Sequence, residues 1–242
     1  KEFMFSLVAV IFALLIGSLF MLITKGDPVA AYVALWDSAF GSLNNFSETL
    51  VNTTPLIFTG LSVAFAFRCG LFNIGGEGQY LIGYVAGAWA GYFFEGLPMI
   101  IHLPLTLLIA IMAGGIWAGF AGLLKAKLGI HEVITTIMLN YIGLYLTVWL
   151  VGTVLMAPGF IPATPEVADS VKLFELFSRG RANAGFLIAI LVAFLIYYLL
   201  WKTYNGYEIR AVGLNSDAAE YGGISVGRNM ILAMFISGAL AG

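Results

Sequence analysis

The sequence predicts an all-α membrane protein, a polytopic bundle of transmembrane helices. Of its 242 residues, 61% are hydrophobic and 10% are charged, whereas a soluble domain carries about 25% charged residues. The mean hydropathy is +0.97. A core of this size cannot bury so many apolar side chains, so much of the surface must face lipid.

Apolar runs that approach or reach the length of a membrane span recur along the chain. A spanning helix needs about 20 mostly apolar residues. We expect residues 1–242 to form a single transmembrane domain within a longer polypeptide, because the chain begins with Lys1 and ends inside an apolar run. The seven predicted spans, the third short and the last cut off, are Phe3–Thr24, Thr49–Phe67, Gln79–Phe94, Leu103–Leu124, Val133–Leu155, Phe186–Trp201 and Met230–Gly242.

The loops between these runs indicate which side of the membrane they face, because Lys and Arg are enriched in cytoplasmic loops. We therefore expect a multi-pass protein of the plasma (inner) membrane with its amino terminus in the cytoplasm. The longer loop 156–184 then lies outside, and its sequence VKLFELF fits either a short amphipathic helix or a plain connector. This orientation places six basic residues inside: Arg68, Lys125, Lys127, Lys202, Arg210 and Arg228.

Glycines recur at four-residue spacing in two of the runs. In lipid, small residues at this spacing let two helix backbones approach closely. The pattern predicts tight helix packing and points to no particular function. The glycines are Gly83, Gly87 and Gly91 in one run and Gly115 and Gly119 in another.

A glycine-rich stretch separates the second and third runs. The segment NIGGEGQ, residues 73–79, contains Asn73, Glu77 and Gln79 among its glycines. Each glycine weakens a helix by about 1 kcal/mol, and a membrane tolerates a broken helix only where protein or a water-filled cavity satisfies the freed backbone groups. Because broken helices often line transporter sites, we favour a functional break over a hydrated boundary group.

The fifth run carries polar residues on one helical face. Glu132, Thr136, Asn140, Gly143 and Thr147 follow at offsets of four, four, three and four residues. Polar side chains at membrane depth usually face the bundle interior or a watery cavity. This face fits a transport path or gate, and it also fits interhelical hydrogen bonding. The predicted substrate-path residues are Asn73, Glu77, Gln79, Glu132, Thr135, Thr136 and Asn140.

The sequence lacks the residues that several classes of protein require. A net charge of −2 argues against nucleic-acid binding, which requires a clustered basic face. There is no phosphate-binding loop with its lysine, and HEVIT has Thr135 where a zinc protease needs a second histidine. Cys69, the single cysteine, cannot form an internal disulfide. We predict no enzyme activity, metal or cofactor for this chain.

The predicted inner loop, residues 203–228, is patterned rather than featureless. EIRAVG fits a strand or a short extended segment, and Asn215 or Ser216 fits the N-cap of a helix of about two turns that ends at glycines. Ala218 and Ala219 would then present small side chains. Such a surface suits docking into a groove on a partner better than a solvated connector does.

Three segments resemble a known family. GYEIRAVGLNSDAAEYGGI (206–224) is similar to the cytoplasmic coupling segment of ABC importer permeases of the ribose and branched-chain amino acid type. GLFNIGGEGQYLIGYVAGAWAG (70–91) and GIHEVITTIMLNYI (129–142) resemble the nucleoside-importing subgroup, where related subgroups carry an Asp-Leu-Ser stretch at 73–75. The resemblance implies a permease of eight to ten spans. The ATPase-coupling residues that it implies are Arg210, Gly213, Asn215, Ala218, Ala219, Tyr221 and Gly222.

The resemblance also implies partners. Two ATP-binding domains, often fused in one subunit, would dock on 203–228 and hydrolyse the ATP, a second permease subunit would complete the pore, and a substrate-binding lipoprotein would deliver solute from outside. We expect inward movement of a polar neutral solute, most simply a nucleoside, by alternating access. A simple-sugar permease, a secondary transporter or channel without an ATPase, and a membrane scaffold without transport are the alternatives.

Overall fold

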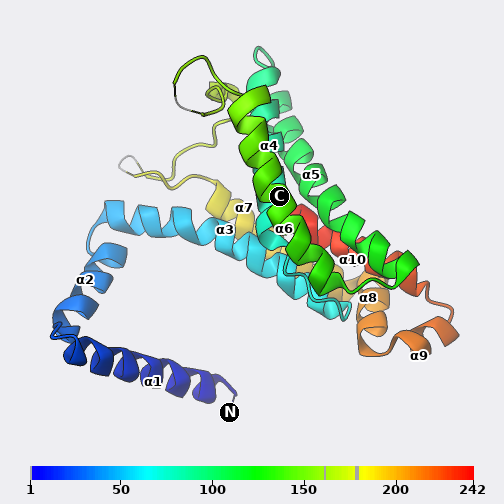
Figure 1. Ribbon diagram of the computed structural model, residues 1–242, viewed down its shortest axis with the longest axis horizontal. Helices are drawn as coiled ribbons and strands as arrows, with labels where there is room; N and C mark the ends of the chain where they lie inside the picture. Colours follow the sequence, from blue (N-terminus) through cyan, green and yellow to red (C-terminus); the bar gives the residue numbers. More distant parts are fainter. Residues whose placement is uncertain (1, 161, 178–179) are drawn as a thin grey trace. The chain divides into compact units, whose positions relative to one another are not determined.

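The computed structural model describes residues 2–160, 162–177 and 180–242, which are mostly helical (Figure 1). The chain divides into two compact units. One comprises Lys1–Val51 with Glu175–Ala182, and the other comprises Asn52–Phe174 with Asn183–Gly242. The predicted all-α architecture is confirmed.

The first unit contains α1 (Glu2–Ile23), α2 (Pro28–Phe40) and the start of α3 (Leu43–Arg68). The Asp27 carboxylate accepts hydrogen bonds from the backbone N–H groups of Val29 and Ala30 and so caps α2. Pro28 follows at the first helical position, where its missing N–H costs nothing. The segment between the first two predicted spans therefore contains a helix whose start is marked by its own cap.

Helix α3 runs into the second unit, which holds the remaining helices. The chain then leaves helical geometry until α4 begins. Helix α6 continues directly into one π-helical turn, η1, and a short 3-10 turn, η2, lies in the long loop before α7. The bounds are α4 Gly76–Phe93, α5 Met99–Leu128, α6 Glu132–Trp149, η1 Leu150–Val154, η2 Asp169–Val171, α7 Gly185–Lys202, α8 Tyr204–Leu214, α9 Ser216–Tyr221 and α10 Val226–Ala241.

Four helices among the described residues are long and apolar enough to cross a membrane. They are α3, α5, α6 together with η1, and α7, each of which covers a predicted span. Two shorter apolar helices, Leu7–Ile23 within α1 and Val226–Ala241, cover the first and last predicted spans. Helix α4, the predicted third span, is 18 residues long and starts with the glycine-rich segment.

The glycine spacing does produce close packing. Helices α5 and α10 meet through Gly114 and Gly238, because a methyl group on Gly238 would overlap Ala118 and the Gly114 carbonyl. A methyl group on Gly115 would lie 2.9 Å from the Phe235 ring. On α4, Gly83 lies against the backbone of Gly242. The prediction of tight packing at the glycine repeats is therefore confirmed for these helices.

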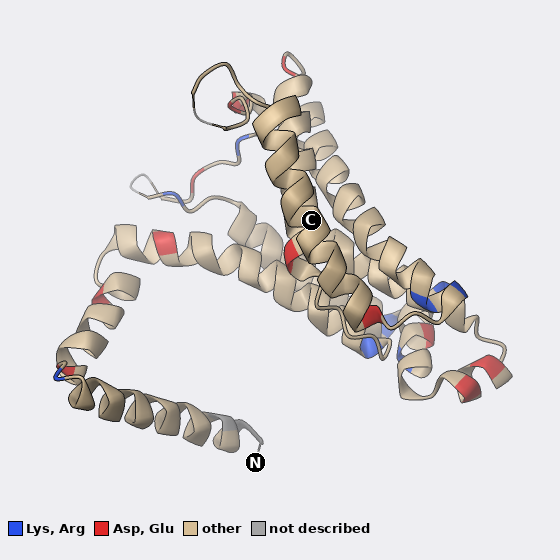
Figure 2. Cartoon of the chain, in the orientation of Figure 1, with Lys and Arg blue, Asp and Glu red and all other residues tan. Residues whose placement is uncertain are grey.

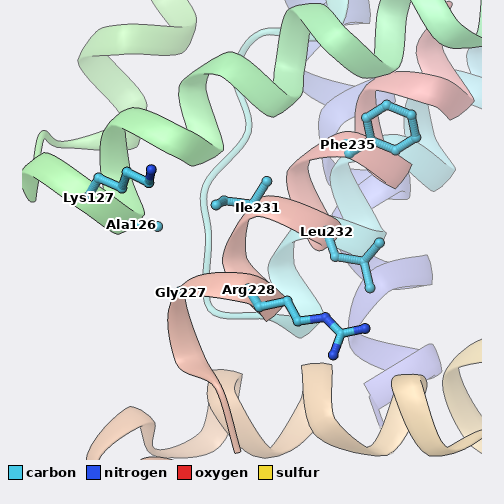
Figure 3. A pocket seen from close by; sticks show the side chains of 7 residues that line it. All are labelled: Ala126, Lys127, Gly227, Arg228, Ile231, Leu232 and Phe235. Atoms are coloured by element: carbon cyan, nitrogen blue, oxygen red, sulfur yellow. The ribbon is translucent and has the colours of Figure 1, made fainter.

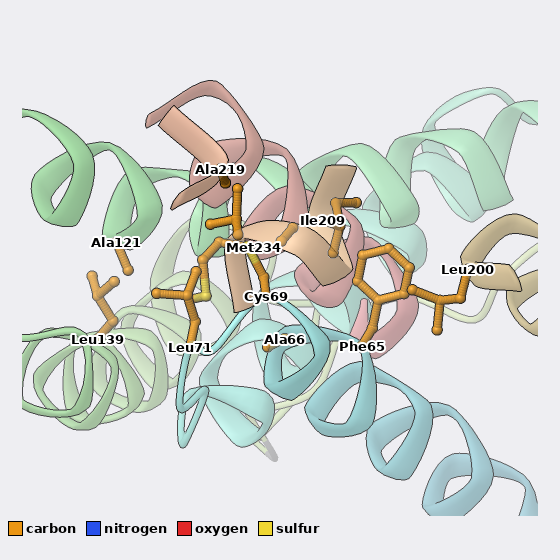
Figure 4. Packing of buried hydrophobic residues seen from close by; sticks show 12 residues of the cluster. Phe65, Ala66, Cys69, Leu71, Ala121, Leu139, Leu200, Ile209, Ala219 and Met234 are labelled. Carbon is orange, nitrogen blue, oxygen red and sulfur yellow. The ribbon is translucent and has the colours of Figure 1, made fainter. Parts of the chain in front are cut away.

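A cluster of buried apolar residues gathers where α8 and α9 meet the longer helices (Figure 4). Phe65 and Ala66 enter it from α3, Ile209 from α8 and Met234 from α10. Ala219 of α9 belongs to the same cluster and is 6% exposed. The short helix is therefore anchored on the bundle through its own side chain.

The basic residues of this unit concentrate at the end that carries α8 and α9, and the helices leading away from it carry few charges (Figure 2). Arg68, at the end of α3, and Arg210 of α8 both lie over the ring of Trp201, the first at 5.6 Å and the second at 4.3 Å from its centroid. One end of the unit thus collects the residues that we expect to face the same side of the membrane.

One local prediction is wrong, and the structure decides between two alternatives for another segment. EIRAVG is neither a strand nor an extended segment but part of α8, whose Thr203 cap accepts a hydrogen bond from the Gly206 N–H. For VKLFELF the connector is the alternative that the structure supports, because helical geometry among the described residues of this loop is limited to Asp169–Val171. The loop is instead tied down by His102, whose ring nitrogens bond the Ser170 hydroxyl at 2.7 Å and the Ala90 carbonyl at 3.1 Å.

Candidate functional site: a broken helix and its coupling segment

The glycine-rich segment is a non-helical link between α3 and α4. Gly70 adopts φ +75°, a left-handed conformation that glycine accepts without strain, and the chain stays irregular until Gly76. The Asn73 side-chain oxygen accepts a hydrogen bond from the Gly75 N–H at 2.8 Å, which is a local turn. We call residues 69–78 the break.

Two amide side chains close the break from inside. The Asn73 amide donates to the Gln79 oxygen at 3.0 Å, and the Gln79 amide donates back to the Asn73 oxygen at 2.9 Å. Both residues are buried, with exposed fractions of 2% and 1%. Asn73 also donates to the Ser237 hydroxyl, which donates in turn to the Ser62 carbonyl. The pair therefore joins α3, α4 and α10.

Asn140 of α6 holds the break from the other side. Its oxygen accepts a hydrogen bond from the Gly78 N–H at 2.8 Å, and its amide donates to the Ile74 carbonyl at 2.9 Å. These backbone groups have left the helical ladder, and unsatisfied polar groups are costly away from water. The Asn140 side chain thus satisfies two backbone groups of the break in this conformation.

Glycine at position 78 is required by this approach. A methyl group there would lie 2.8 Å from the Asn140 Cα and 2.9 Å from the Leu139 carbonyl oxygen. Gly143, one turn further along α6, would bring a methyl group to 3.2 Å from the Gly78 Cα. The polar face of α6 therefore lies against the start of α4. In this conformation its Asn140 forms hydrogen bonds to the break.

The remaining predicted path residues are spread along this face. Thr136 is buried, and its hydroxyl donates to the Glu132 carbonyl of its own helix. Thr135 is half-buried and bonds the His131 carbonyl. Glu132 pairs with Lys125 of α5 at 2.8 Å, which closes the α5–α6 turn. Glu77 is exposed in the first turn of α4, so it lies apart from the buried amides.

The predicted coupling segment folds as two consecutive helices. Asn215 separates α8 from α9 and caps α9, since its side-chain oxygen accepts a hydrogen bond from the Ala218 N–H at 3.0 Å. Helix α9 then ends at Gly222, as predicted. Ala218 is exposed, whereas the expectation that Ala219 is presented on the surface is wrong, because Ala219 packs into the chain's own core.

The exposed side of this segment carries two large residues. Tyr221 is 98% exposed and Leu214 is 88% exposed. We call these two residues and the exposed Ala218 together the α9 surface. Tyr is enriched among residues that dominate protein interfaces. Leu214 was not among the predicted coupling residues.

Helix α8 touches the chain just before the break. A methyl group on Gly213 would overlap the Arg68 carbonyl, and a methyl group on Gly70 would lie 3.3 Å from the Gly213 Cα. Glu208 of α8 also accepts a hydrogen bond from the Asn229 amide of α10 at 3.2 Å. Helix α8 is therefore in backbone contact with the start of the break through Gly213 and bonded to α10 through Glu208.

The comparison with known proteins identifies the family. Residues 45–242 match the family model for the branched-chain amino acid transport system / permease component. The chain belongs to this permease family. The predicted membership of the ABC importer permeases is confirmed.

Curated relatives match this chain over almost all of its length. The guanosine ABC transporter permease protein NupP of Bacillus subtilis (strain 168) is 43% identical over 98% of this chain and 68% of that protein. The nucleoside ABC transporter permease protein NupB of Lactococcus lactis subsp. cremoris (strain MG1363) is 37% identical over 100% of this chain and 69% of that protein. The glucose ABC transporter permease protein TsgB13 of Haloferax volcanii is 32% identical over 96% of this chain and 64% of that protein. No solved structure matches the permease.

The residues that join the permease's break to α10 and α3 were not predicted from the sequence. Ser237 and Ser62 are fully buried, and their hydroxyl oxygens lie 3.0 Å apart. A serine inside an apolar run with small neighbours was the only signal, and it is common at membrane helix contacts. Their partner, Asn73, lies 164 residues away from Ser237 in sequence, so only the fold brings them together.

Proposed function

We propose that the permease is the membrane subunit of an ATP-driven importer that moves a nucleoside into the cytoplasm. Relatives named as guanosine and nucleoside ABC transporter permeases support this substrate class, since their similarity extends over the whole chain. Few charged residues lie along the spanning helices (Figure 2), which fits a polar neutral solute better than an ion.

The observation that carries the proposal is the break and its clamp by Asn140. One amide side chain bonds both the Ile74 carbonyl and the Gly78 N–H across an interrupted helix. Such an interface can open, because water or the hydroxyl and ring-nitrogen groups of a solute can replace Asn140 as hydrogen-bond partners of the same backbone groups. In this account Asn73 and Gln79 shape the gate, whereas Asn140, Thr135 and Glu77 lie nearer the solute's route.

The coupling segment receives the driving motion. We place residues 203–228 in the cytoplasm, where two ATP-binding domains, often fused in one subunit, dock on the α9 surface and hydrolyse ATP. A groove that accepts Tyr221 and Leu214 would bury large apolar and aromatic side chains, which dominate many interfaces. A second permease subunit and a substrate-binding lipoprotein complete the importer, and the external protein supplies affinity for the solute.

The contact between Gly213 and Gly70 supplies a route to the gate. A displacement of α9 moves α8, since only Asn215 separates the two helices. The backbone of α8 cannot move toward residues 68–70 without displacing them, because no side chain lies between the two segments. Closely packed elements of this kind have discrete arrangements rather than a continuous range. ATP-driven docking would therefore shift the break between closed and open forms.

The proposal is tested by transport with purified components. The complete importer is reconstituted in proteoliposomes with ATP on the side of residues 203–228, and uptake of labelled guanosine is measured. We expect uptake that requires hydrolysable ATP and persists when ionophores abolish ion gradients. Uptake that follows a proton or sodium gradient without ATP would instead identify a secondary transporter, and no flux of any solute would identify a scaffold.

A sugar substrate is the second candidate, favoured by one observation. The relative TsgB13, named as a glucose ABC transporter permease, is 32% identical over nearly the whole chain. Competition in the same assay separates the two substrates. Excess unlabelled adenosine should suppress guanosine uptake while excess glucose should not, and the reverse pattern with labelled glucose would support the sugar.

A further inference from the structure

A cavity of about 560 Å³ opens between α5 and α10 at the end of the bundle that carries the basic residues (Figure 3). Its volume is within the range of small-molecule sites. Ala126 and Lys127 line it from α5, and α10 supplies the remaining wall. The lining residues of α10 are Gly227, Arg228, Ile231, Leu232 and Phe235.

The α10 wall is polar at one end and apolar along the rest. Arg228, Ile231, Leu232 and Phe235 follow at offsets of three, one and three residues, so they share one helical face. Arg228 stands in the first turn of α10, whereas Phe235 stands two turns further, with its ring against Gly115 of α5. The cavity therefore runs from a cationic end to an apolar end along the helix axis.

The two basic residues at the cationic end of the cavity are not paired with carboxylates among the described residues. Lys125, two residues before Lys127, is already paired with Glu132. Lys127 and Arg228 form no ion pair with any described residue, and both are exposed. The nearest carboxylate along α8, that of Glu208, already accepts hydrogen bonds from Asn229 and Tyr204. Neither cation thus has an acidic partner among the described residues, and the two side chains lie on different sides of the apolar groove, with the Arg228 guanidinium directed away from Lys127 (Figure 3).

We propose that this groove binds an anionic phospholipid, with the headgroup between Lys127 and Arg228, where both charges attract its phosphate, and an acyl chain along Ile231, Leu232 and Phe235. Basic pockets between transmembrane helices at a cytoplasmic boundary recognise lipid headgroups in this way. Inorganic phosphate would satisfy the cations but leave the apolar wall uncovered. Only the assignment to the inner leaflet rests on the proposed orientation, and the site itself does not depend on the transported solute.

The test compares two lipids with identical acyl chains. The assembled importer in detergent is titrated with dioleoyl phosphatidylglycerol or dioleoyl phosphatidylcholine, and bound lipid is counted by native mass spectrometry. We expect phosphatidylglycerol to bind more tightly. A double variant, Lys127→Gln with Arg228→Gln, should weaken that binding about thirty-fold, or about fivefold for each charge removed. Lys202→Gln with Lys172→Gln also removes two positive charges, both outside the groove, and should change nothing.

A second variant tests the apolar wall with both charges intact. Ile231→Trp fills the groove and should lower phosphatidylglycerol binding while the importer still assembles. Equal phosphatidylglycerol affinity in the double variant and in Lys202→Gln with Lys172→Gln would overturn the proposal. Displacement of the lipid by millimolar inorganic phosphate would also overturn it, since the site would then recognise a free anion. A changed oligomeric state in the double variant without any lipid preference would instead assign the groove to a second copy of the chain.

Discussion

Asn73 and Gln79 face each other across the break and exchange two amide hydrogen bonds, of 3.0 and 2.9 Å. Both side chains are buried from solvent. The Gln79 amide therefore obtains from Asn73 the hydrogen bonds that lipid or an apolar core cannot supply, while Asn73 is also bonded to Ser237 and Gly75. Their role in this conformation is to fix the shape of the break, and a direct contact with solute would require that the pair separate.

Gln79→Leu should destabilise the permease. The substitution keeps a side chain of similar size but removes both hydrogen bonds between Gln79 and Asn73, a loss of about 1–3 kcal/mol, while Asn73 keeps its bonds to Ser237 and Gly75. Thermal unfolding of the purified permease, followed by fluorescence-detected size exclusion, measures the effect. Glu77→Gln, two residues away and exposed, serves as the control and should unfold like the wild type. Equal stability of the two variants would show that the amide pair contributes nothing.

Asn140→Leu should abolish most nucleoside uptake while the protein still inserts into the membrane. It removes both hydrogen bonds to the break, and it also removes a polar group from membrane depth, which favours insertion. Thr59→Val is the matched control, because the Thr59 hydroxyl of α3 bonds carbonyls of its own helix turn and lies outside the proposed path. Wild-type uptake by Asn140→Leu would exclude the break as part of the gate.

Ala218→Glu and Ala219→Glu should fail in different ways, although the residues are adjacent. Ala218 is exposed, so a glutamate there should leave the permease folded but prevent co-purification of the ATPase, because a packed interface would have to desolvate the new charge. Ala219 is 6% exposed within the chain's core, so a glutamate there should lower permease expression by itself. Normal ATPase binding and coupling by Ala218→Glu would remove α9 from the docking surface.

Lys125→Gln should destabilise the α5–α6 turn. The Glu132 side chain is 9% exposed and would lose its partner at 2.8 Å, and a carboxylate left in a buried position costs about 1–3 kcal/mol even with partial access to water. The double change Lys125→Gln with Glu132→Gln should recover much of that loss. If the double variant is no more stable than Lys125→Gln, the ion pair does not explain the burial of Glu132.

The helices could be predicted from the sequence where an apolar run or a cap marks them. Asn215 was identified as a cap from its residue type, and the structure has its side chain bonded to the Ala218 N–H. Helix α8 was not predicted, because EIRAVG has no apolar period over so short a segment. Its helical state comes from Ile209 and Val212, which are buried in the core cluster, so tertiary packing decides it.

The partners within the site could not be predicted in the same way. The three- and four-residue spacing predicts the polar face of α6. That spacing does not show whether the face contacts Gly78 or faces water. Likewise the sequence gives no means to separate Ala218 from Ala219, since six residues are too few for a helical period to show which side is buried. Both facts depend on contacts between segments that are distant in sequence.

The most direct test of the account is the number of guanosine molecules transported per ATP hydrolysed by assembled importers that carry Gly213→Ala. The added methyl group overlaps the Arg68 carbonyl and so alters the contact between α8 and the break without touching the α9 surface. Gly60→Ala, where the same methyl group meets no neighbouring atom within 4 Å, is the control. We predict that Gly213→Ala still hydrolyses ATP but transports about tenfold less guanosine per ATP. A ratio equal to that of wild type and Gly60→Ala would contradict the proposed route from the coupling segment to the gate.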